Sequence, residues 1–546
     1  MKTAVLILVY FLISSLSIAL ANEGQSLFET KCDTCHALKT ALKKTKDLKG
    51  WEKTTLKMAE YSEGEISEDE AKIIAKYLAA KPPESVDQTK TSKKAVQKNV
   101  KPDTEKSHDT HHHIYDFKQV RVDQFISPEV CKGCHSEIFD QWSGSMHSKA
   151  FVDPVWRAAT KLFVKDVTQE GEIMEMKACV KCHTPLGFRS HSISSPEDDY
   201  DKLAALPAQG IFCNWCHNIN EVKHLGDAGY EVNPDGINDE PSTMLGPFKD
   251  SVSPFHPTKY SKLHTTSEFC WLCHNVSHAA NNLPIEQTYD EWKNSPYNTG
   301  DPKTTVHCQD CHMRQKPGVP ATGKTERPDN PGQACDSGPE RDHIWTHYFV
   351  GANAVVTKIL GNNIHSNMAI ERLQHAADLK ILKSTPYIKN QLSRINISVI
   401  NSGAGHYLPT GLTEVRQMWL DVNITDAKGN VLLRSGQLNG KKEIDQHAVV
   451  FRTQLGNKHG ESELNVAKAD RILYDHRIPP KGYRIERYDF YIPKEAVSPL
   501  KIEAVLKYRS ASQALANILL GDNAPEIPVI NMASITETID ISELKK

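Results

Sequence analysis

CKGCHSEIFDQWSGSMHSKAF, residues 131–151, is the stretch of sequence that decides the fold of this protein. It opens with two cysteines two residues apart, followed directly by a histidine. This Cys-Xaa-Xaa-Cys-His pattern occurs six times in the 546-residue chain and uses 12 of its 13 cysteines, leaving Cys335 over. The six copies are Cys32–Cys35–His36, Cys131–Cys134–His135, Cys179–Cys182–His183, Cys213–Cys216–His217, Cys270–Cys273–His274 and Cys308–Cys311–His312.

The repeated pattern indicates covalent attachment of c-type haem. The two thiols form thioethers with the porphyrin, and the histidine supplies the proximal axial ligand of the iron. Paired cysteines alone are more often zinc or redox sites, but neither of those requires a histidine after the second cysteine. The sequence therefore predicts six covalently bound haem c groups, held by the 18 residues of the six motifs.

The N-terminus has the features of a secretory signal peptide. Met1 and Lys2 precede a long apolar run that ends in Ala19-Leu20-Ala21, an A-x-A cleavage site. We therefore expect residues 1–21 to be removed, and the mature chain to be periplasmic or extracellular without a membrane span. An uncleaved anchor is the alternative.

Composition sets further limits on function. The chain has 65 Lys+Arg against 68 Asp+Glu, a net charge of −3, so nothing indicates nucleic-acid binding. Its length predicts several domains. Hydrophobic residues make up a modest 39% of the chain, and we expect buried porphyrins to act as additional apolar core.

Residues 22–80 have the pattern of a small helical domain with one haem. Ser67 is a natural helix N-cap with Glu70 three residues on, a capping box, and Ile73, Ile74, Tyr77 and Leu78 form an apolar stripe. The early haem motif, Trp51, Met58 and this helix together resemble class I cytochromes c. In that family a methionine is the sixth iron ligand, and the resemblance assigns this role to Met58; the alternative is core packing.

Residues 81–124 are rich in Lys, Thr and Pro and predict a flexible linker; thirty such residues have a reach of roughly 30 Å. It ends near a histidine cluster comprising His108, His111, His112 and His113. Such a cluster can bind metal or a haem iron, but we expect a solvated linker.

Residues 125–378 carry the other five motifs, whose first cysteines are separated by 48, 34, 57 and 38 residues. Such short intervals cannot form independent domains, so we expect one mostly α-helical and irregular domain packed around five haems. The stretches around these motifs, together with HYFVGAN at 347–353, resemble the cytochrome c-552/4 family, which is built on tetrahaem cytochrome c-554.

This resemblance implies distal iron ligands. It assigns His147 and His224 to that role, and it favours His264 before the fifth motif and His347 in HYFVGAN. The fifth partner stays open among His191, His278 and His406. Because Met/His ligation raises the potential of a haem above that of bis-His ligation, the first haem is expected to have the highest potential.

Residues 379–546 contain no haem motif and alternate in hydrophobicity as strands do. The alternating sets are 395/397/399, 418/420/422/424, 488/490/492 and 502/504/506/508, with a turn at 426–430. We predict an all-β sandwich acting as a scaffold or docking domain. GHYLPTG (405–411) and DHRIPP (475–480) resemble the C-terminal sandwich of some large multihaem relatives.

The predicted function is electron transfer outside the cytoplasm in anaerobic respiration, with other cytochromes or a membrane quinol-oxidising complex as redox partners. The alternative is an oxidoreductase acting on nitrite, hydroxylamine, tetrathionate or sulfite at one open-site haem. The CxxCK motif that often marks such a haem is absent from the sequence. A third possibility is self-assembly into conductive filaments.

Overall fold

The computed structural model describes residues 27–28, 46–61, 66–80, 117–224, 226–234, 242–383 and 386–543. The chain divides into two compact units, Met1–Glu105 and Lys106–Lys546. The predicted signal peptide, the first haem motif at 32–36 and the histidine cluster at 108–113 lie outside the described residues.

The described part of the first unit is a pair of helices, α3 (Leu48–Tyr61) and α4 (Glu68–Ala80). The predicted capping box of α4 is confirmed: the Ser67 backbone N–H donates to the Glu70 carboxylate over 2.8 Å, and the Glu70 N–H donates to the Ser67 hydroxyl over 3.3 Å. Ile74 and Leu78 of the predicted stripe are buried and pack with Trp51 of α3, whereas Ile73 and Tyr77 are half-buried.

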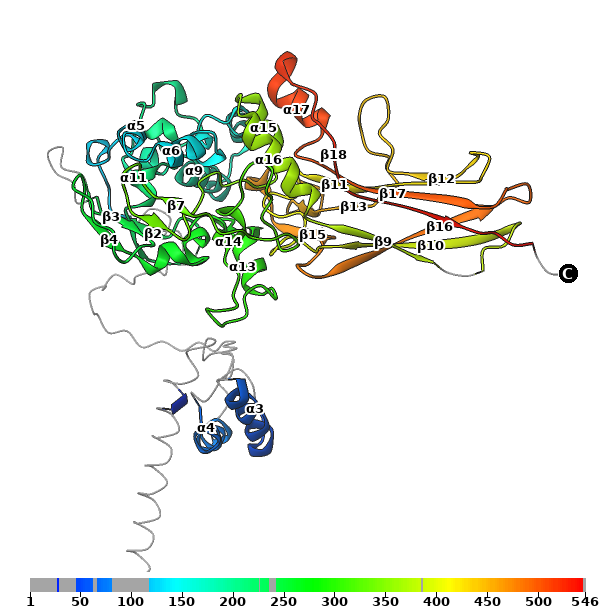
Figure 1. Ribbon diagram of the computed structural model, residues 1–546, viewed down its shortest axis with the longest axis horizontal. Coiled ribbons are helices and arrows are strands. Elements are labelled where there is room, and N and C mark those ends of the chain that lie inside the picture. Colours follow the sequence, from blue (N-terminus) through cyan, green and yellow to red (C-terminus); the bar gives the residue numbers. More distant parts are fainter. Residues whose placement is uncertain are drawn as a thin grey trace, which may run out of the picture. The chain divides into compact units, whose positions relative to one another are not determined.

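In the second unit, the haem-motif region (residues 117–377) consists of short helices joined by irregular segments (Figure 1). Three helices begin or end on a motif, because the Cys-Xaa-Xaa-Cys-His pattern itself forms about one helical turn. The helices are α5 (Pro128–Lys132), α6 (Ser136–Ser143), α7 (Met146–Lys149), α8 (Pro154–Phe163), α9 (Glu170–His183), α10 (Pro185–Arg189), α11 (Cys213–Cys216), α12 (Glu268–Trp271), α13 (Thr288–Lys293), α14 (Cys308–His312), α15 (Ala354–Ile359) and α16 (Asn363–Gln374).

Four pairs of very short strands pin the loops between these helices. They are β1 (Ile219–Val222) with β2 (Tyr230–Val232), β3 (Met244–Gly246) with β4 (Thr258–Tyr260), β5 (Val276–Ser277) with β6 (Pro284–Glu286), and β7 (Gly332–Gln333) with β8 (Glu340–Arg341). The β3–β4 pair is parallel and the other three are antiparallel.

The β-rich region (residues 378–543) contains two larger antiparallel sheets and one helix, α17 (Gln513–Leu520). One sheet has the order β16-β10-β9, and the other has the order β12-β11-β17-β18 with β13 on β11; β14 and β15 form a separate pair. The strands are β9 (Asp378–Lys383), β10 (Gln391–Ile400), β11 (Gln417–Thr425), β12 (Val431–Ser435), β13 (Val450–Phe451), β14 (Thr453–Gly456), β15 (Arg471–Asp475), β16 (Tyr483–Ile492), β17 (Leu500–Arg509) and β18 (Ile530–Ile539).

The predicted alternation is confirmed in these sheets. Every residue of the four alternating sets is buried, on β10, β11, β16 and β17 respectively. The predicted turn at 426–430 connects β11 to β12, and Gly429 adopts φ 85°, which favours glycine. Since strand side chains alternate between faces, one face of each sheet contributes to the core.

A single hydrophobic core joins the two regions of the second unit. It contains inward residues of both large sheets together with Met368, Ala369 and Leu373 of α16. In Figure 1, α15 and α16 lie where the haem-motif region meets the β-rich region. The β-rich region is therefore packed directly against the haem-motif region.

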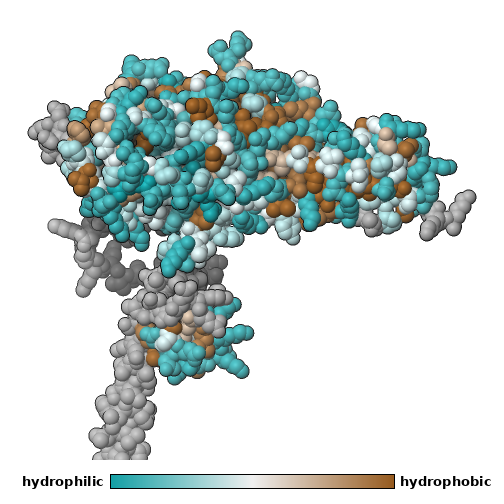
Figure 2. All heavy atoms as spheres, viewed as in Figure 1, coloured by the Kyte–Doolittle hydropathy of each residue, from teal (hydrophilic) through white to brown (hydrophobic). Residues whose placement is uncertain are grey.

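The surface drawn in Figure 2 is mainly hydrophilic, with hydrophobic residues in small scattered groups. None of the helices among the described residues combines the length and the apolar character that crossing a membrane requires.

Candidate haem-binding site

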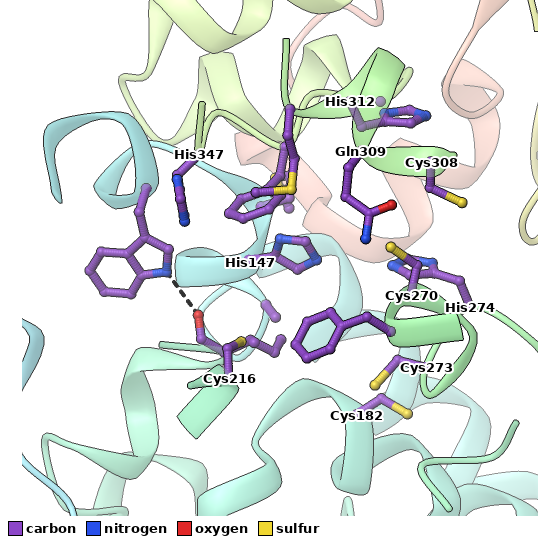
Figure 3. A pocket seen from close by; sticks show the side chains of 18 of the residues that line it. His147, Cys182, Cys216, Cys270, Cys273, His274, Cys308, Gln309, His312 and His347 are labelled. Atoms are coloured by element: carbon purple, nitrogen blue, oxygen red, sulfur yellow. Dashed lines mark hydrogen bonds between the residues drawn. The ribbon is translucent and has the colours of Figure 1, made fainter. Parts of the chain in front are cut away.

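A continuous cavity of about 1600 Å³ lies inside the second unit. Ordinary small-molecule pockets measure roughly 300–1,000 Å³. The walls include cysteines and the histidine of all five motifs between residues 131 and 312, with many aromatic and aliphatic side chains. Figure 3 shows labelled cysteines and histidines gathered around part of it. An interior with this lining fits several apolar porphyrins attached side by side.

The five motif histidines share one hydrogen-bonding arrangement. In each, Nδ1 is paired with an acceptor, and no described residue hydrogen-bonds Nε2. The acceptors are the carbonyls of Ala334 for His135 (2.6 Å), Ala150 for His183 (2.8 Å), Leu245 for His217 (2.5 Å) and Val350 for His312 (2.8 Å), and the carboxylate of Glu286 for His274 (3.2 Å). Metal-ligating histidines almost always anchor their second nitrogen in this way. The arrangement thus fits five proximal ligands that present Nε2 to iron.

Burial keeps most of the cavity imidazoles neutral, which is the form that binds metal. It lowers the pKa of His183 and of His347 to about 4, and that of His147 to about 3. His274 differs: burial lowers its pKa, but the hydrogen bond and charge of Glu286 outweigh burial and raise it.

Three motif histidines face a second histidine across the cavity. With metal–nitrogen bonds of about 2 Å, two imidazoles on opposite sides of one metal ion have ring centres roughly 6 Å apart. The observed centroid distances are 6.4 Å for His135–His256, 6.2 Å for His274–His147 and 6.4 Å for His312–His406. These spacings fit bis-histidine coordination of three haem irons.

Backbone contacts hold two of these opposing histidines. His406 pairs its Nδ1 with the Tyr407 carbonyl at 2.9 Å, and His256 pairs its Nδ1 with the Pro257 carbonyl at 3.2 Å. His147 lies on α7, and its backbone carbonyl accepts the Ile211 N–H over 3.0 Å. At Gly210, with φ 64°, a Cβ would lie 2.6 Å from the same carbonyl, so a side chain there would displace α7.

For His217 the structure offers two neighbours. The His264 ring lies 5.6 Å away, but its Nε2 pairs with the Cys216 carbonyl at 3.1 Å and its Nδ1 with the Ser261 hydroxyl. His347 lines the cavity, and the charges of His217 and His135 contribute to its lowered pKa. Its Nδ1 pairs with the Trp345 carbonyl, and no described residue hydrogen-bonds its Nε2. His347 therefore has the free nitrogen that a distal ligand needs.

His183 has a different neighbour. Trp156 of α8 stacks on its ring at 4.3 Å with planes 6° apart, and Tyr200 in turn stacks on Trp156 at 5.6 Å. Among the described residues, no histidine makes a ring contact with His183. This is the one motif of the five described for which no opposing histidine is found in the described part of the chain.

Three histidines considered from the sequence are not among the residues that line the cavity. His224 follows β1 closely in the chain, and its ring lies 6.1 Å from that of Phe117. His278 is buried and pairs its Nε2 with the Ala467 carbonyl. His191 is exposed and has φ 54°. Of the three histidines left open for the fifth partner, only His406 lies opposite a motif histidine.

Thiols of different motifs lie side by side in three places, within hydrogen-bonding reach of each other. The pairs are Cys131 with Cys213, Cys182 with Cys273, and Cys270 with Cys308. Figure 3 shows the latter two pairs. Cys216 also lies close enough to Cys270 and Cys273 for its charge to affect their pKa values. Every described motif is therefore close to another, and the five attachment sites form one connected array.

The β-rich region contributes part of the cavity wall, including His406. The loop that carries His406 is fixed by buried Glu291 of α13, whose carboxylate accepts the Tyr407 N–H over 3.1 Å and the Thr410 hydroxyl over 2.7 Å. Glu291 also forms a buried ion pair with Arg477. The sequence analysis predicted only a scaffold or docking role for the β-rich region, and it did not predict that this region lines the cavity.

Sequence reasoning missed His256. It lies in the loop before β4, outside any stretch that resembles a known family, and the only available signal was the number of histidines. Met58 lies on α3 with 37% of its surface exposed, and the first haem motif lies outside the described residues. Cys335 lines the cavity beside Ala334, whose carbonyl holds His135.

Comparisons with known proteins agree with this geometry. Residues 130–218 match the family model described as cytochrome c554 and c-prime. The penta-heme cytochrome c552 of Thermochromatium tepidum matches 76% of this chain and 99% of its own, with 20% identity and a TM-score of 0.50, and so has a similar fold. No curated protein matches the chain.

Another solved structure, the CARDB domain of the PF1109 protein from Pyrococcus furiosus, covers 31% of this chain and 86% of its own, with 12% identity and a TM-score of 0.14, too low to support an argument. The motifs, the anchored histidines and the matches with cytochromes agree. Residues 130–218 thus match a cytochrome c family, and the fold is similar to that of a penta-heme cytochrome c.

Proposed function

We propose that this protein is a hexahaem c-type cytochrome that relays electrons outside the cytoplasm. Five haems are proposed to be attached between Cys131 and His312, and the sixth at Cys32, Cys35 and His36. The observation that carries the proposal is the set of five motif histidines around one cavity, each with Nδ1 on an acceptor. With the side-by-side thiols, it supports a contiguous array rather than isolated haems.

Three proposed axial partners follow from the ring contacts: His256, His147 and His406 are proposed as distal ligands opposite His135, His274 and His312. His347 is proposed for His217 because it lines the same cavity and no described residue hydrogen-bonds its Nε2. His264 and His224 are less well supported. The His264 ring lies 5.6 Å from that of His217, but both its nitrogens are paired, and His224 is not among the residues that line the cavity.

The haem count is tested by a pyridine haemochrome assay on protein matured in a host with haem-attachment machinery. We expect six haems per chain. Replacing both cysteines of one motif by alanine should remove one haem, whereas Cys335→Ala should remove none. Four or fewer haems in the unmodified protein would contradict the proposal.

The N-terminal segments of the sequence bear on where the protein acts and how it is organised. The export signal at 1–21, the N-terminal haem module at 22–80 and the linker at 81–124 together suggest a tethered carrier in the periplasm or outside the cell. Cytochromes c are typically found outside the cytoplasm, which supports this location. Its partners would be other redox proteins, such as cytochromes or a quinol-oxidising complex.

Met58 is proposed as the sixth ligand of the first haem. Met58→Ala should convert that haem to high spin and lower its potential, since Met/His ligation gives the higher potential. Low-temperature electron paramagnetic resonance and potentiometry check both effects. An unchanged highest potential would mean that Met58 is a packing residue.

A second candidate function is favoured by the surroundings of His183. The ring contact of this imidazole is with Trp156, and no described histidine opposes it. A haem with only one protein ligand keeps a position open for a small molecule. The alternative is therefore an oxidoreductase acting on nitrite, hydroxylamine, sulfite or tetrathionate at this site.

Spin state and ligand binding separate the two candidates. A pure carrier should be almost wholly low-spin and should not bind carbon monoxide rapidly when reduced. One high-spin haem per chain, with turnover of one of these compounds at more than a trace rate, would favour the oxidoreductase. Replacing Trp156 by leucine should alter that high-spin signal only if the open site is the haem bound by His183.

A further inference from the structure

The proximal histidines differ in the charge of the group that holds Nδ1. Four are held by neutral backbone carbonyls, whereas His274 is held by the Glu286 carboxylate at 3.2 Å. Glu286 also accepts the Thr288 hydroxyl over 3.3 Å, which helps to fix the carboxylate beside His274. A carboxylate acceptor makes a ligating imidazole more basic. Among the five described sites, only that of His274 therefore has a negative charge hydrogen-bonded to its proximal ligand.

At the neighbouring haem-attachment site, residues 308–312, the nearby charged group is a cation and not a carboxylate. Arg372 of α16 lines the cavity and donates to the Ala321 carbonyl over 3.1 Å and to the Cys311 carbonyl over 2.8 Å. No acidic side chain in the described part of the chain forms an ion pair with it, and its buried Nε has no hydrogen-bond partner there. Burial lowers the pKa of Arg372 only to about 10, so it is charged at neutral pH.

Arg372 lines the same cavity as His312 and His406, and it donates to the carbonyl of Cys311, the residue before His312. A buried cation without a carboxylate partner is costly in protein alone. A haem attached at Cys308 and Cys311 would lie close to this charge, because Arg372 donates to the Cys311 carbonyl.

The two sites are adjacent. The thiols of Cys270 and Cys308 lie side by side, and the Ser267 hydroxyl accepts the Cys308 N–H over 3.1 Å. Gln309 of α14 also donates to the Thr266 carbonyl over 2.7 Å. The segment before α12 and the start of α14 are therefore hydrogen-bonded to each other, which holds the two haem-attachment sites side by side.

Resting on the proposed electron-transfer function, we propose that Glu286 and Arg372 make electron flow through this array directional, by placing the haem at 270–274 at a lower potential than the haem at 308–312. Negative charge on a proximal ligand stabilises the oxidised iron, and a nearby cation stabilises the reduced iron. One electron leaves the first iron and enters the second, with no bond or proton exchanged. Electrons then collect at the site whose second ligand, His406, comes from the β-rich region.

Other charges near Glu286 are smaller contributors. Arg416 faces Glu286 and donates to the Ser510 carbonyl over 3.2 Å, so it offsets part of the negative charge. Glu414 also faces this group, and burial raises its pKa to about 7. Neither is hydrogen-bonded to a motif histidine, whereas Glu286 is.

The test is potentiometry of the full-length holoprotein, followed by optical spectra and electron paramagnetic resonance. Arg372→Gln should lower the midpoint of one haem, and Glu286→Gln should raise that of another, each by at least a tenfold change in electron partition, which is about 59 mV for a one-electron couple. Arg372→Lys keeps the charge and should keep the midpoint close to wild type. Arg487→Gln, which removes a surface arginine of β16, is the matched control and should shift no midpoint.

Unchanged midpoints in both charge-removing variants, with six haems retained, would overturn the proposal, as would shifts of the same haem in the same direction. If Arg372→Gln loses haem, Glu286→Gln decides: a raised midpoint supports the proposal, and an unchanged one overturns it. Failure of the electron-transfer function itself would differ, because the unmodified protein would then show no reversible haem reduction.

Discussion

His312 and His406 face each other with ring centroids 6.4 Å apart and planes 21° from parallel, although 94 residues of sequence and the boundary between two regions separate them. His312 ends α14 in the haem-motif region, and His406 lies in a loop of the β-rich region. In the proposed ligand assignment, the β-rich region therefore supplies one of the two axial ligands of this haem.

Replacing His406 by alanine tests this relationship. We expect one haem per chain to become high-spin, because its iron would lose the second ligand. His278→Ala is the control: that histidine pairs with the Ala467 carbonyl away from the cavity, and the spin state should stay as in the unmodified protein. Low-temperature electron paramagnetic resonance measures both, and an unchanged spectrum for His406→Ala would exclude this ligand.

Glu291 holds the loop that presents His406. Glu291→Gln weakens a buried ion pair, which typically costs about 3–5 kcal/mol when one partner is left alone. Asp475 also pairs with Arg477, so we expect a loss of up to about 3 kcal/mol in the free energy of unfolding, measured in denaturant. Asp489→Asn, which breaks the exposed pair with Arg394, should cost less than about 1 kcal/mol. Equal losses in the two variants would mean that Glu291 does not anchor the loop.

His256 and His264 give opposite expectations. His256→Ala should make the haem bound by His135 high-spin, since its ring faces that histidine at 6.4 Å. His264→Ala should leave all spin states unchanged, because its Nε2 is occupied by the Cys216 carbonyl. Low-temperature electron paramagnetic resonance of the two variants measures the spin states. A high-spin haem in His264→Ala and none in His256→Ala would mean that His264, and not His256, is an iron ligand.

Asp426 predicts acid sensitivity in the turn between β11 and β12. The Asn430 side chain and the N–H groups of Asn430, Val497 and Lys428 donate to its carboxylate and lower its pKa to about 2. Its stabilising effect is present above the ordinary pKa of about 4 and is lost as the pH falls toward 2. The stability difference between the protein and Asp426→Asn should therefore shrink from pH 4 to pH 2, as followed by denaturant unfolding. A difference that stays constant over this interval would contradict the assignment.

Local patterns predicted the elements that depend on neighbouring residues. The capping box at Ser67 and Glu70, the buried alternation on β10 and β11 and the turn at Asp426 are all found as predicted. Each depends on side-chain periodicity or on a hydrogen bond that spans a few residues, so a short stretch of sequence contains the necessary information.

By itself the sequence predicted the chemistry of the proximal side, because each Cys-Xaa-Xaa-Cys-His motif brings two thiols and one imidazole into a single helical turn. Only the tertiary structure decided which second histidine faces which motif. His256 and His406 are distant in sequence from His135 and His312, and their positions depend on loops fixed by β4 and by Glu291. Contacts between distant segments arise from packing of the whole chain, and no local pattern records them.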